Sequence, residues 1–266
     1  MTENAARAAY RDILRQRVGA FFRNVRYGPP GSHCANCGVP PVATGSLCSQ
    51  CGRQRQQFGD RLASQVVLLA YVKGYAPGGP HQSAHTVRAY KQEPWPVRKC
   101  ATDLASMVSV ATRLHGNCIA DAHGPCSAIT FVPSVRHPGT DHPVVTLARQ
   151  VSGLGVDRAA HVVLGLGPGS DPGYDRTVRA DRFELSGQNR SRVRGRHVMV
   201  VDDTWTSGAK VQSAAVALRD AGAEHVTALV VGRWCDYRAP DHKAMLDSLD
   251  TPYDALVCPV SGGTCP

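Results

Sequence analysis

Apolar residues recur along the chain with two different periods. Residues 5–25 carry apolar side chains at helical spacing and arginines on another face, which predicts an amphipathic helix. From residue 62 onward, short apolar runs alternate with amphipathic stretches, a pattern typical of a parallel α/β domain. The predicted strands cover 66–72, 127–133, 160–164, 197–202, 225–231 and 254–258, and the predicted helices cover 83–92, 98–115, 142–152, 208–221 and 240–249.

Glycine and proline divide the chain into three predicted parts. Gly28-Pro-Pro-Gly31 ends the first helix, and the following stretch has few aliphatic residues but four cysteines. We therefore expect an N-terminal amphipathic helix in 1–31, a small cysteine module in 32–57 and the α/β domain in 62–266. Residues 165–175 are rich in glycine and proline and predict an exposed, mobile loop of the kind that acts as a lid.

Composition narrows the class of partner and the location. The longest apolar run, 66–72, is far shorter than the roughly 20 residues that span a bilayer, so no transmembrane segment is expected. Charged residues near the start do not fit a signal peptide, which predicts a cytoplasmic protein with reduced cysteines. The chain of 266 residues has 30 basic and 21 acidic side chains, a net charge of +9 that favours anionic partners.

The positive charge is concentrated at the front of the chain. Residues 1–60 hold eight arginines against three acids, which is compatible with a single-stranded nucleic acid or a protein partner. Aromatic residues make up only 6% of the chain, whereas single-strand binding usually adds stacking aromatics. The charge of residues 1–60 therefore does not decide whether they bind a nucleic acid or a protein.

Four cysteines have the spacing of a metal site. Cys34 and Cys37 form one C-x2-C pair, and Cys48 and Cys51 form a second pair ten residues later. Two such pairs let four thiolates converge on one Zn²⁺, which predicts a zinc ribbon with a structural ion. A redox C-x2-C motif and an iron–sulfur cluster are the alternatives.

Glycines and the remaining cysteines extend this interpretation. Gly38 and Gly52 each follow the second cysteine of a pair, where the turn commonly needs a positive φ. The other cysteines are interpreted as buried thiols that act as small apolar side chains. Cys258 and Cys265 bracket a Ser-Gly-Gly run, a spacing that is also compatible with loop closure or metal binding.

The segment His197-Val-Met-Val-Val-Asp-Asp-Thr-Trp-Thr-Ser-Gly-Ala-Lys210 carries the main candidate chemistry. A buried strand delivers Asp202 and Asp203 at its carboxyl end, the edge at which open α/β sheets bind ligands. The loop after them offers hydroxyls and backbone N–H groups at a helix start, which can cradle a phosphate. Because carboxylates would repel that phosphate, they are expected to accept hydrogen bonds from sugar hydroxyls. A ribose 5-phosphate fits both halves, provided that the acid pair and the loop share one cavity.

At these residues the chain resembles the binding motif for 5-phosphoribosyl 1-diphosphate (PRPP) of the type I phosphoribosyltransferases. Together with the cysteine pairs, the motif is similar to the ComF-like members, which join a zinc ribbon to this domain. The resemblance implies a parallel sheet flanked by helices with a mobile hood. It also implies Mg²⁺-dependent displacement of pyrophosphate from C1 of PRPP by an acceptor that the sequence does not identify. Its site consists of the acids Asp202 and Asp203 and the phosphate loop Thr204, Thr206, Ser207, Gly208, Ala209 and Lys210. Lys210 stands where the family usually has threonine.

Two further segments resemble the family more weakly. Residues 129–136 are similar to the strand and loop that hold pyrophosphate, with Ser134 and Arg136 directed at phosphate oxygens. Residues 175–183 correspond to the hood, where Arg179 would stabilise charge on the departing pyrophosphate.

Two interpretations compete with this one. In the first, the acid pair has only a structural role: Asp203 and Thr204 cap the start of the following helix. The other is a binding protein that keeps the PRPP pocket for sensing, or that acts as a ComF-like competence-type factor on nucleic acid or protein.

Overall fold

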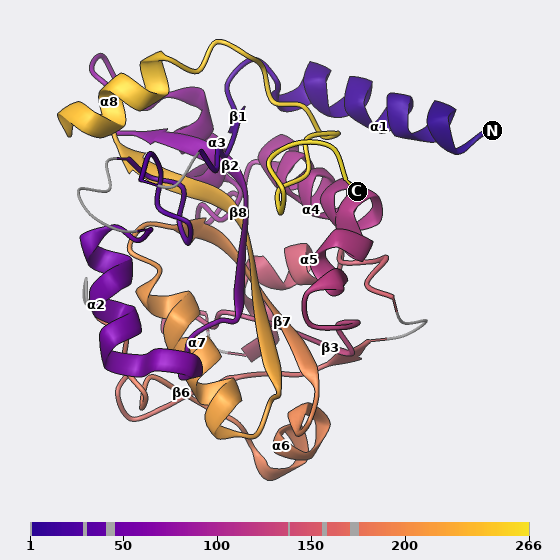
Figure 1. The fold of residues 1–266 in the computed structure, drawn as a ribbon, viewed down its shortest axis with the longest axis vertical. Coiled ribbons are helices and arrows are strands. Elements are labelled where there is room, and N and C mark those ends of the chain that lie inside the picture. Colours follow the sequence, from indigo (N-terminus) through magenta and orange to yellow (C-terminus); the bar gives the residue numbers. More distant parts are fainter. Residues whose placement is uncertain are drawn as a thin grey trace.

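A six-stranded sheet organises the part of the chain that is described in the computed structural model, namely residues 2–28, 31–40, 46–137, 139–155, 159–170 and 176–265 (Figure 1). Its order is β1-β2-β8-β7-β3-β4, and all neighbours are parallel except β1, which runs antiparallel to β2. The strands are β1 (Arg23–Asn24), β2 (Gln65–Gly74), β3 (Ala128–Phe131), β4 (Ala160–His161), β7 (His197–Trp205) and β8 (His225–Asp236). A separate antiparallel pair joins β5 (Gly165–Leu166) to β6 (Phe183–Glu184). The predicted fold class is confirmed: a mostly parallel sheet flanked by helices.

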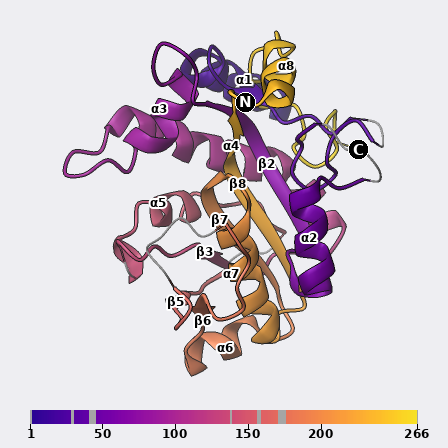
Figure 2. The same cartoon turned by 90° about the vertical axis from the view of Figure 1, so that its left-hand side faces the viewer.

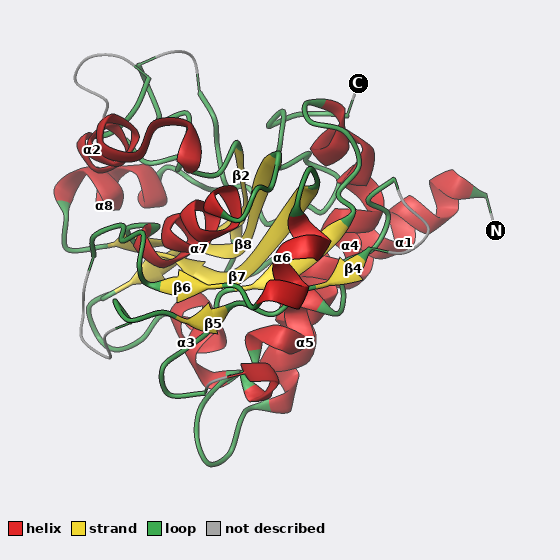
Figure 3. Cartoon of the chain, turned by 90° about the horizontal axis from the view of Figure 1, so that it is seen from below, coloured by secondary structure: helices red, strands yellow, loops and turns green. Residues whose placement is uncertain are grey.

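Helices cover both faces of this sheet. The α-helices are α1 (Glu3–Val18), α2 (Ser49–Phe58), α3 (Gln82–Ala89), α4 (Arg98–Asp121), α5 (Val144–Ala148), α6 (Gly187–Val193), α7 (Ala209–Asp220) and α8 (Pro240–Asp247), and short 3₁₀ turns lie at Gly59–Arg61 and Gly139–Asp141. Figure 3 shows α7 on one side of the strands and α3 and α5 on the other. Alternation along the strands explains the two layers: Val201 packs into the core that holds α4 and α5, whereas Val200 packs into the core that holds α7.

The order of the strands creates a switch point between β7 and β3. From β3 the chain continues to its neighbour β4, whereas from β7 it continues in the opposite direction to its neighbour β8. Connections that leave adjacent strands in opposite directions open a crevice at their carboxyl ends, where ligands of open α/β sheets bind. Asp202 and Asp203 lie near the carboxyl end of β7, directly at this switch point.

The first helix is shorter than the sequence predicts. It ends at Val18, and the guanidinium of Arg23 donates to the carbonyl oxygens of Gly19 and Phe22 at 3.1 and 2.8 Å. The chain then turns into β1, which pairs with the edge of β2. Phe22 and Val25 are buried, so the apolar signal beyond Val18 comes from core packing rather than from helix periodicity.

The predicted strand at 254–258 is wrong, because this segment has no ladder partner in the described chain. It is tied instead to Asn24, whose Nδ2 donates to the carbonyl oxygen of Asp254 at 2.9 Å and whose Oδ1 accepts from the N–H of Asp254 at 2.8 Å. Tyr253 and Ala255 fill the core beside α4.

Two other expectations hold only in part. The predicted strand at 160–164 is formed over two residues, and the predicted loop at 165–175 contains β5. Residues 171–175 of that loop, including the first residue of the predicted hood, lie outside the described residues. So do Pro29 and Pro30, which are expected to end the first helix, and 41–45 of the cysteine module.

The cysteine module packs directly against the sheet. Val25 and Val39 share a core with Leu68 of β2, and the hydroxyl of Tyr71 donates to the carbonyl oxygen of Gly38 at 2.5 Å. Helix α2, which begins within the second cysteine pair, lies beside α7 (Figure 2). Among the described residues, none of the helices combines the length and the apolar character needed to cross a membrane.

Candidate functional site

Asp202 and Asp203 are both buried at the end of β7. Asp202 is 9% exposed and Asp203 is 4% exposed. The Oδ1 atom of Asp202 accepts the backbone N–H of Asp203 at 2.9 Å, which folds its side chain back over the strand end. The carboxyl pair therefore lies beneath the surface of the switch point rather than standing open to solvent, as a freely accessible sugar site would require.

The carboxylate of Asp203 is held by two residues at the end of α3. The hydroxyl of Tyr90 donates to its Oδ2, and the ammonium of Lys91 binds the same oxygen at 2.5 Å. The hydroxyl of Thr204 also interacts with this carboxylate. Asp203 thus faces protein donors in this structure, whereas the sequence predicts that it faces a sugar. Sequence periodicity could not reveal this, because Tyr90 and Lys91 lie more than 110 residues away along the chain.

These contacts separate the pKa values of the two acids. Burial alone would raise the pKa of Asp203, but the Lys91 charge and the hydrogen bonds from Lys91 and Tyr90 outweigh it and lower this pKa. Burial, assisted by the charge of Asp203, raises the pKa of Asp202 to about 7. At neutral pH the pair therefore combines one fixed carboxylate with one carboxyl group that titrates.

A neutral histidine adjoins the pair. Burial lowers the pKa of His142 to about 4, against the opposing influence of the Asp203 charge. Its Nδ1 accepts the backbone N–H of Val144 at 3.2 Å, which leaves the proton on Nε2. His142 is a second residue that the sequence analysis missed, since a lone histidine in a polar loop carries no distinguishing signal.

The loop after the acids is shaped by a glycine packed on a tryptophan. Gly208 has φ +75°, and a Cβ at this position would overlap the ring of Trp205. Only glycine meets both conditions without strain. Trp205 is 1% exposed and anchors the turn.

The carbonyl oxygens of this loop are drawn toward the cysteine module. Arg233 of β8 donates from Nη1 to the carbonyl oxygens of Trp205 and Thr206, each at 3.1 Å, and Gln54 of α2 donates to that of Ser207 at 3.0 Å. In a planar trans peptide the N–H points opposite to the C=O. The N–H groups of Thr206, Ser207 and Gly208 are therefore directed away from Arg233 and Gln54, as three successive donors of the kind that bind an anion.

The other predicted contacts fall into two groups. Ser134 and Arg136 follow β3 at the same edge of the sheet as the acids, and the hydroxyl of Ser134 accepts the backbone N–H of Arg136 at 3.3 Å. Exposed Lys210 begins α7, and its charge acts on both Asp202 and His142. Arg179 lies instead beside α7, where its N–H donates to the hydroxyl of Ser213 at 2.9 Å and its Nε lies 3.4 Å from Asp181.

The predicted cysteines do converge. The sulfur atoms of Cys34, Cys37, Cys48 and Cys51 all lie within 4.8 Å of one another, an arrangement that could hold a metal ion. The amide of Asn36 donates to the Cys51 sulfur at 3.3 Å. Such donors accompany thiolate ligands, so the residues fit the predicted ion.

The glycines next to the cysteine pairs differ from each other. Gly38 has the expected positive φ of 66°. Gly52 lies inside α2 and has no positive φ, because the second cysteine pair opens a helix rather than a turn.

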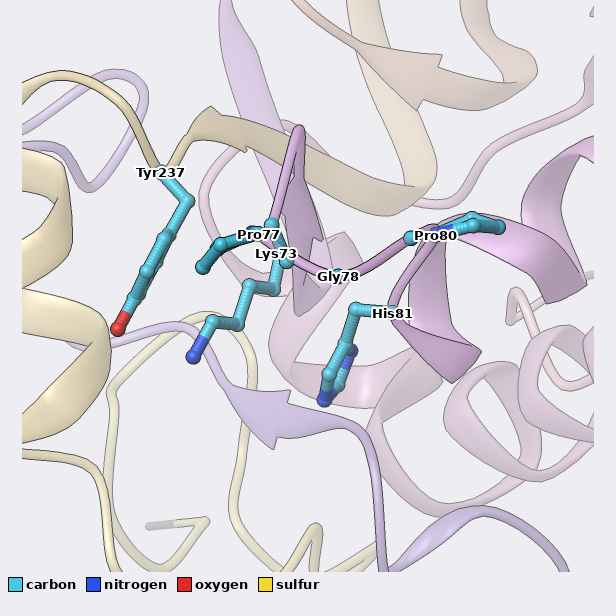
Figure 4. A pocket seen from close by; sticks show the side chains of 8 residues that line it. Lys73, Pro77, Gly78, Pro80, His81 and Tyr237 are labelled. Carbon is cyan, nitrogen blue, oxygen red and sulfur yellow. The ribbon is translucent and has the colours of Figure 1, made fainter.

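A surface cavity of about 400 Å³ lies on another part of the same sheet edge (Figure 4). It is lined by the loop that follows β2 and by Tyr237, which follows β8, with Lys73 3.7 Å above the Tyr237 ring. Its lining is glycine and proline backbone with one cation and one histidine. It is separate from the predicted phosphate loop.

Comparison with known proteins gives structural similarities only. No family model matches the chain, and no curated protein matches its sequence. A phosphoribosyltransferase from Corynebacterium diphtheriae is 15% identical, with 70% of this chain and 94% of that chain covered and a TM-score of 0.31. The hypoxanthine-guanine phosphoribosyltransferase of L. donovani is 13% identical over 49% of this chain and 71% of that chain, with a TM-score of 0.35.

An allosteric regulatory enzyme of purine biosynthesis is 16% identical over 48% of this chain, with a TM-score of 0.31. The match spans about a quarter of that enzyme's length, 26%. At these levels of identity and TM-score, the similarities fix neither a substrate nor a reaction for this chain.

Proposed function

We propose that this chain binds PRPP, or a related ribose 5-phosphate, at the β7–β3 switch point and displaces pyrophosphate from its C1 atom. The observation that carries the proposal is the loop 204–208, whose three outward N–H groups follow directly on an acid pair. A phosphate at those N–H groups places the attached ribose toward the strand end, where Asp202 and Asp203 lie. The motif resemblance requires the same arrangement.

Each group then has a distinct role toward the ligand. The N–H groups of 206–208 and the Lys210 ammonium bind the 5′-phosphate. Because Asp203 is engaged by Lys91 and Tyr90, Asp202 is the carboxyl group that meets the ribose hydroxyls, and its buried side chain must leave the N–H of Asp203 and turn outward to do so. For Asp203 to join it, the half-exposed Lys91 side chain must leave the carboxylate and turn toward the anionic ligand.

The reaction exchanges one bond at C1. The bond between C1 and the pyrophosphate oxygen breaks through a transition state with oxocarbenium character, and the acceptor's nucleophilic atom bonds to C1 and loses its proton. Arg136, with Ser134, stabilises negative charge on the departing pyrophosphate, and Arg179 does so once the hood closes. Mg²⁺ bound with PRPP would supply further charge neutralisation, and the carboxylate of Asp202 would help to hold it.

The cysteine cluster supports this site through hydrogen bonds and is not part of the ligand-binding residues. With Zn²⁺ bound to Cys34, Cys37, Cys48 and Cys51, the module becomes a rigid body that presents the Cys37 carbonyl and Gln54 to the loop system. The ion is structural, since all four ligand positions are filled by thiolates.

Calorimetry with PRPP and Mg²⁺ tests the binding step. Wild type is expected to bind, Asp202→Asn to bind at least tenfold more weakly, and Asp241→Asn, an exposed acid on α8, to bind unchanged. Equal affinity of wild type and Asp202→Asn would refute the assignment. A pyrophosphate-release screen across candidate acceptors then tests the chemical step.

A second candidate is a PRPP-sensing protein without catalysis. The specific observation in its favour is the burial of Asp203 beneath Tyr90 and Lys91, which removes one carboxylate from the sugar site. Binding of PRPP without pyrophosphate release for any acceptor supports the sensor. Release with even one acceptor supports the transferase.

A further inference from the structure

A second cluster of metal-binding side chains lies where the C-terminal segment meets α4, on the opposite side of the sheet from the cysteine module. The Nδ1 or Nε2 atom of His115 and the sulfur atoms of Cys258 and Cys265 all lie within 4.8 Å of one another. His115 is 1% exposed and Cys258 is fully buried. Figure 1 shows the end of the C-terminal trace beside α4.

The hydrogen bonds of His115 fix the nitrogen that it can offer. Its Nε2 lies 2.8 Å from the carbonyl oxygen of Ala255, and a carbonyl can only accept, so the proton is on Nε2. Its Nδ1 then carries a lone pair and points at the sulfur of Cys265, 2.9 Å away. A histidine whose far N–H is held by a backbone carbonyl is the usual arrangement of a metal ligand.

Cys258 sits in a tight turn that directs amides at its sulfur. The N–H of Gly262 donates to the Cys258 carbonyl at 2.8 Å, and Gly262 has φ +75°. The backbone N–H groups of Val260 and Ser261 bond to the Cys258 thiol group. This is the geometry of a cysteine in a metal-binding turn, where N–H groups neutralise a thiolate.

Cys118 lies next to this three-residue cluster and is the candidate for a fourth ligand. It lies three residues after His115 on α4, so both side chains project from the same face of the helix. Its thiol interacts with those of Cys265 and Cys258. Tetrahedral zinc with bonds of about 2.0–2.3 Å places its ligand atoms roughly 3.5–3.8 Å apart, a modest contraction for His115, Cys258 and Cys265, and the Cys118 side chain must move closer to join them.

We propose that His115, Cys118, Cys258 and Cys265 form a second metal site, a Cys₃His centre for a zinc-class divalent ion. The ion clamps the C-terminal segment onto α4. This segment has neither strand pairing nor a helix after Asp247 among its described residues, and it is held to the core by single side chains such as Tyr253 and Ala255. A structural ion supplies the stability that such a segment lacks. The site is independent of the proposed function at the β7–β3 switch point.

Zinc content of the full chain, purified under reducing conditions, tests the site directly. Elemental analysis is expected to give two zinc ions per chain. The double variant Cys258→Ser with Cys265→Ser is expected to keep one, and Cys34→Ser with Cys37→Ser is also expected to keep one. Cys100→Ala, which removes a buried thiol from the same helix but outside the cluster, is expected to keep two.

Cobalt substitution gives a second readout on the chain with an intact cysteine module. The difference spectrum between wild type and the Cys258/Cys265 variant should contain thiolate-to-cobalt charge transfer and tetrahedral d–d bands, and His115→Ala should change the d–d bands. A zinc content that the Cys258/Cys265 substitutions leave unchanged overturns the proposal. So does a mass two units low that shows a disulfide between any two of these cysteines.

Discussion

Arg233 joins the Cys37 carbonyl oxygen to the loop that follows the acid pair. Its Nε donates to Cys37 at 3.0 Å, while its Nη1 donates to the carbonyls of Trp205 and Thr206 and also to that of Trp234. The guanidinium is 5% exposed. One buried cation therefore satisfies acceptors from the cysteine module, the loop and β8 at once.

Replacing Arg233 by lysine should loosen the loop and the module together. An ammonium group cannot reach these carbonyls in the fixed fork of a guanidinium, and each buried acceptor left without a donor costs about 1–3 kcal/mol. We expect a loss of roughly 3 kcal/mol in the free energy of unfolding, measured by urea denaturation, and weaker PRPP binding. Arg53→Lys, an exposed change on α2, is the matched control. Unchanged stability of Arg233→Lys would show that the module and the loop are not coupled through this residue.

Asp202 should make stability depend on pH in an unusual direction. Its pKa is raised to about 7, so between about pH 4 and 7 the folded chain keeps a proton that the unfolded chain has released. The free energy of unfolding contributed by this group is therefore complete below about pH 4 and is lost as the pH rises through 7.

The variant Asp202→Asn isolates that contribution. Relative to wild type, it should gain roughly 2–4 kcal/mol between pH 4 and 8, because each pKa unit corresponds to about 1.4 kcal/mol. Asp203→Asn should behave oppositely, since the pKa of Asp203 is lowered and its stabilisation is present at neutral pH. Denaturation curves at several pH values measure both, and parallel curves for wild type and Asp202→Asn would contradict the assignment.

Gly208→Ala should damage both folding and phosphate binding. The added methyl group meets the Trp205 ring at a backbone conformation with φ +75° that alanine adopts only under strain. We expect a loss of roughly 2–4 kcal/mol in stability by thermal or urea denaturation. Gly187→Ala, at the start of α6 with open space around its Cα, should change neither property. Equal stability of the two variants would mean that the loop can repack.

The ion pair between Lys91 and Asp203 should be visible in a double-mutant cycle. Lys91→Met leaves a buried carboxylate with fewer donors, so its stability should fall, and most of that loss should vanish when Asp203→Asn is already present. Because the Lys91 side chain is 37% exposed, we expect a coupling of only about 1–2 kcal/mol. Additive effects of the two substitutions would show that the pair contributes nothing measurable.

Local patterns were sufficient for the parallel strands β2, β3, β7 and β8 and for the strand and loop of the acid-pair motif, but they missed β1. The apolar runs of β7 and β8 are continuous because parallel strands are covered on both faces, and the acid pair marks the approach to the carboxyl end of β7. The periodicity failed at 254–258, where Tyr253 and Ala255 are apolar because they fill a core beside α4 without sheet pairing. An apolar run shows that a segment is buried, but it does not show whether the segment is a strand or an irregular part of the core.

The candidate site was only half predictable for a related reason. The spacing of the cysteines and of Asp202 with its loop is local, and the sequence contains it. The partners of those groups, Lys91 after α3, His142 after β3 and Arg233 on β8, come from elements far apart in the chain. Only the fold brings them together, so no motif could have revealed that Asp203 is already engaged.

The hydrogen bonds between Asn24 and Asp254 have a consequence for folding during synthesis on the ribosome. The two residues are 230 positions apart. At a translation rate of about 5–20 residues per second, Asp254 is synthesised roughly 10–45 s after Asn24. During that interval Asn24 lacks its hydrogen-bond partner, so the contact between the β1 segment and the C-terminal segment forms only when synthesis is nearly complete.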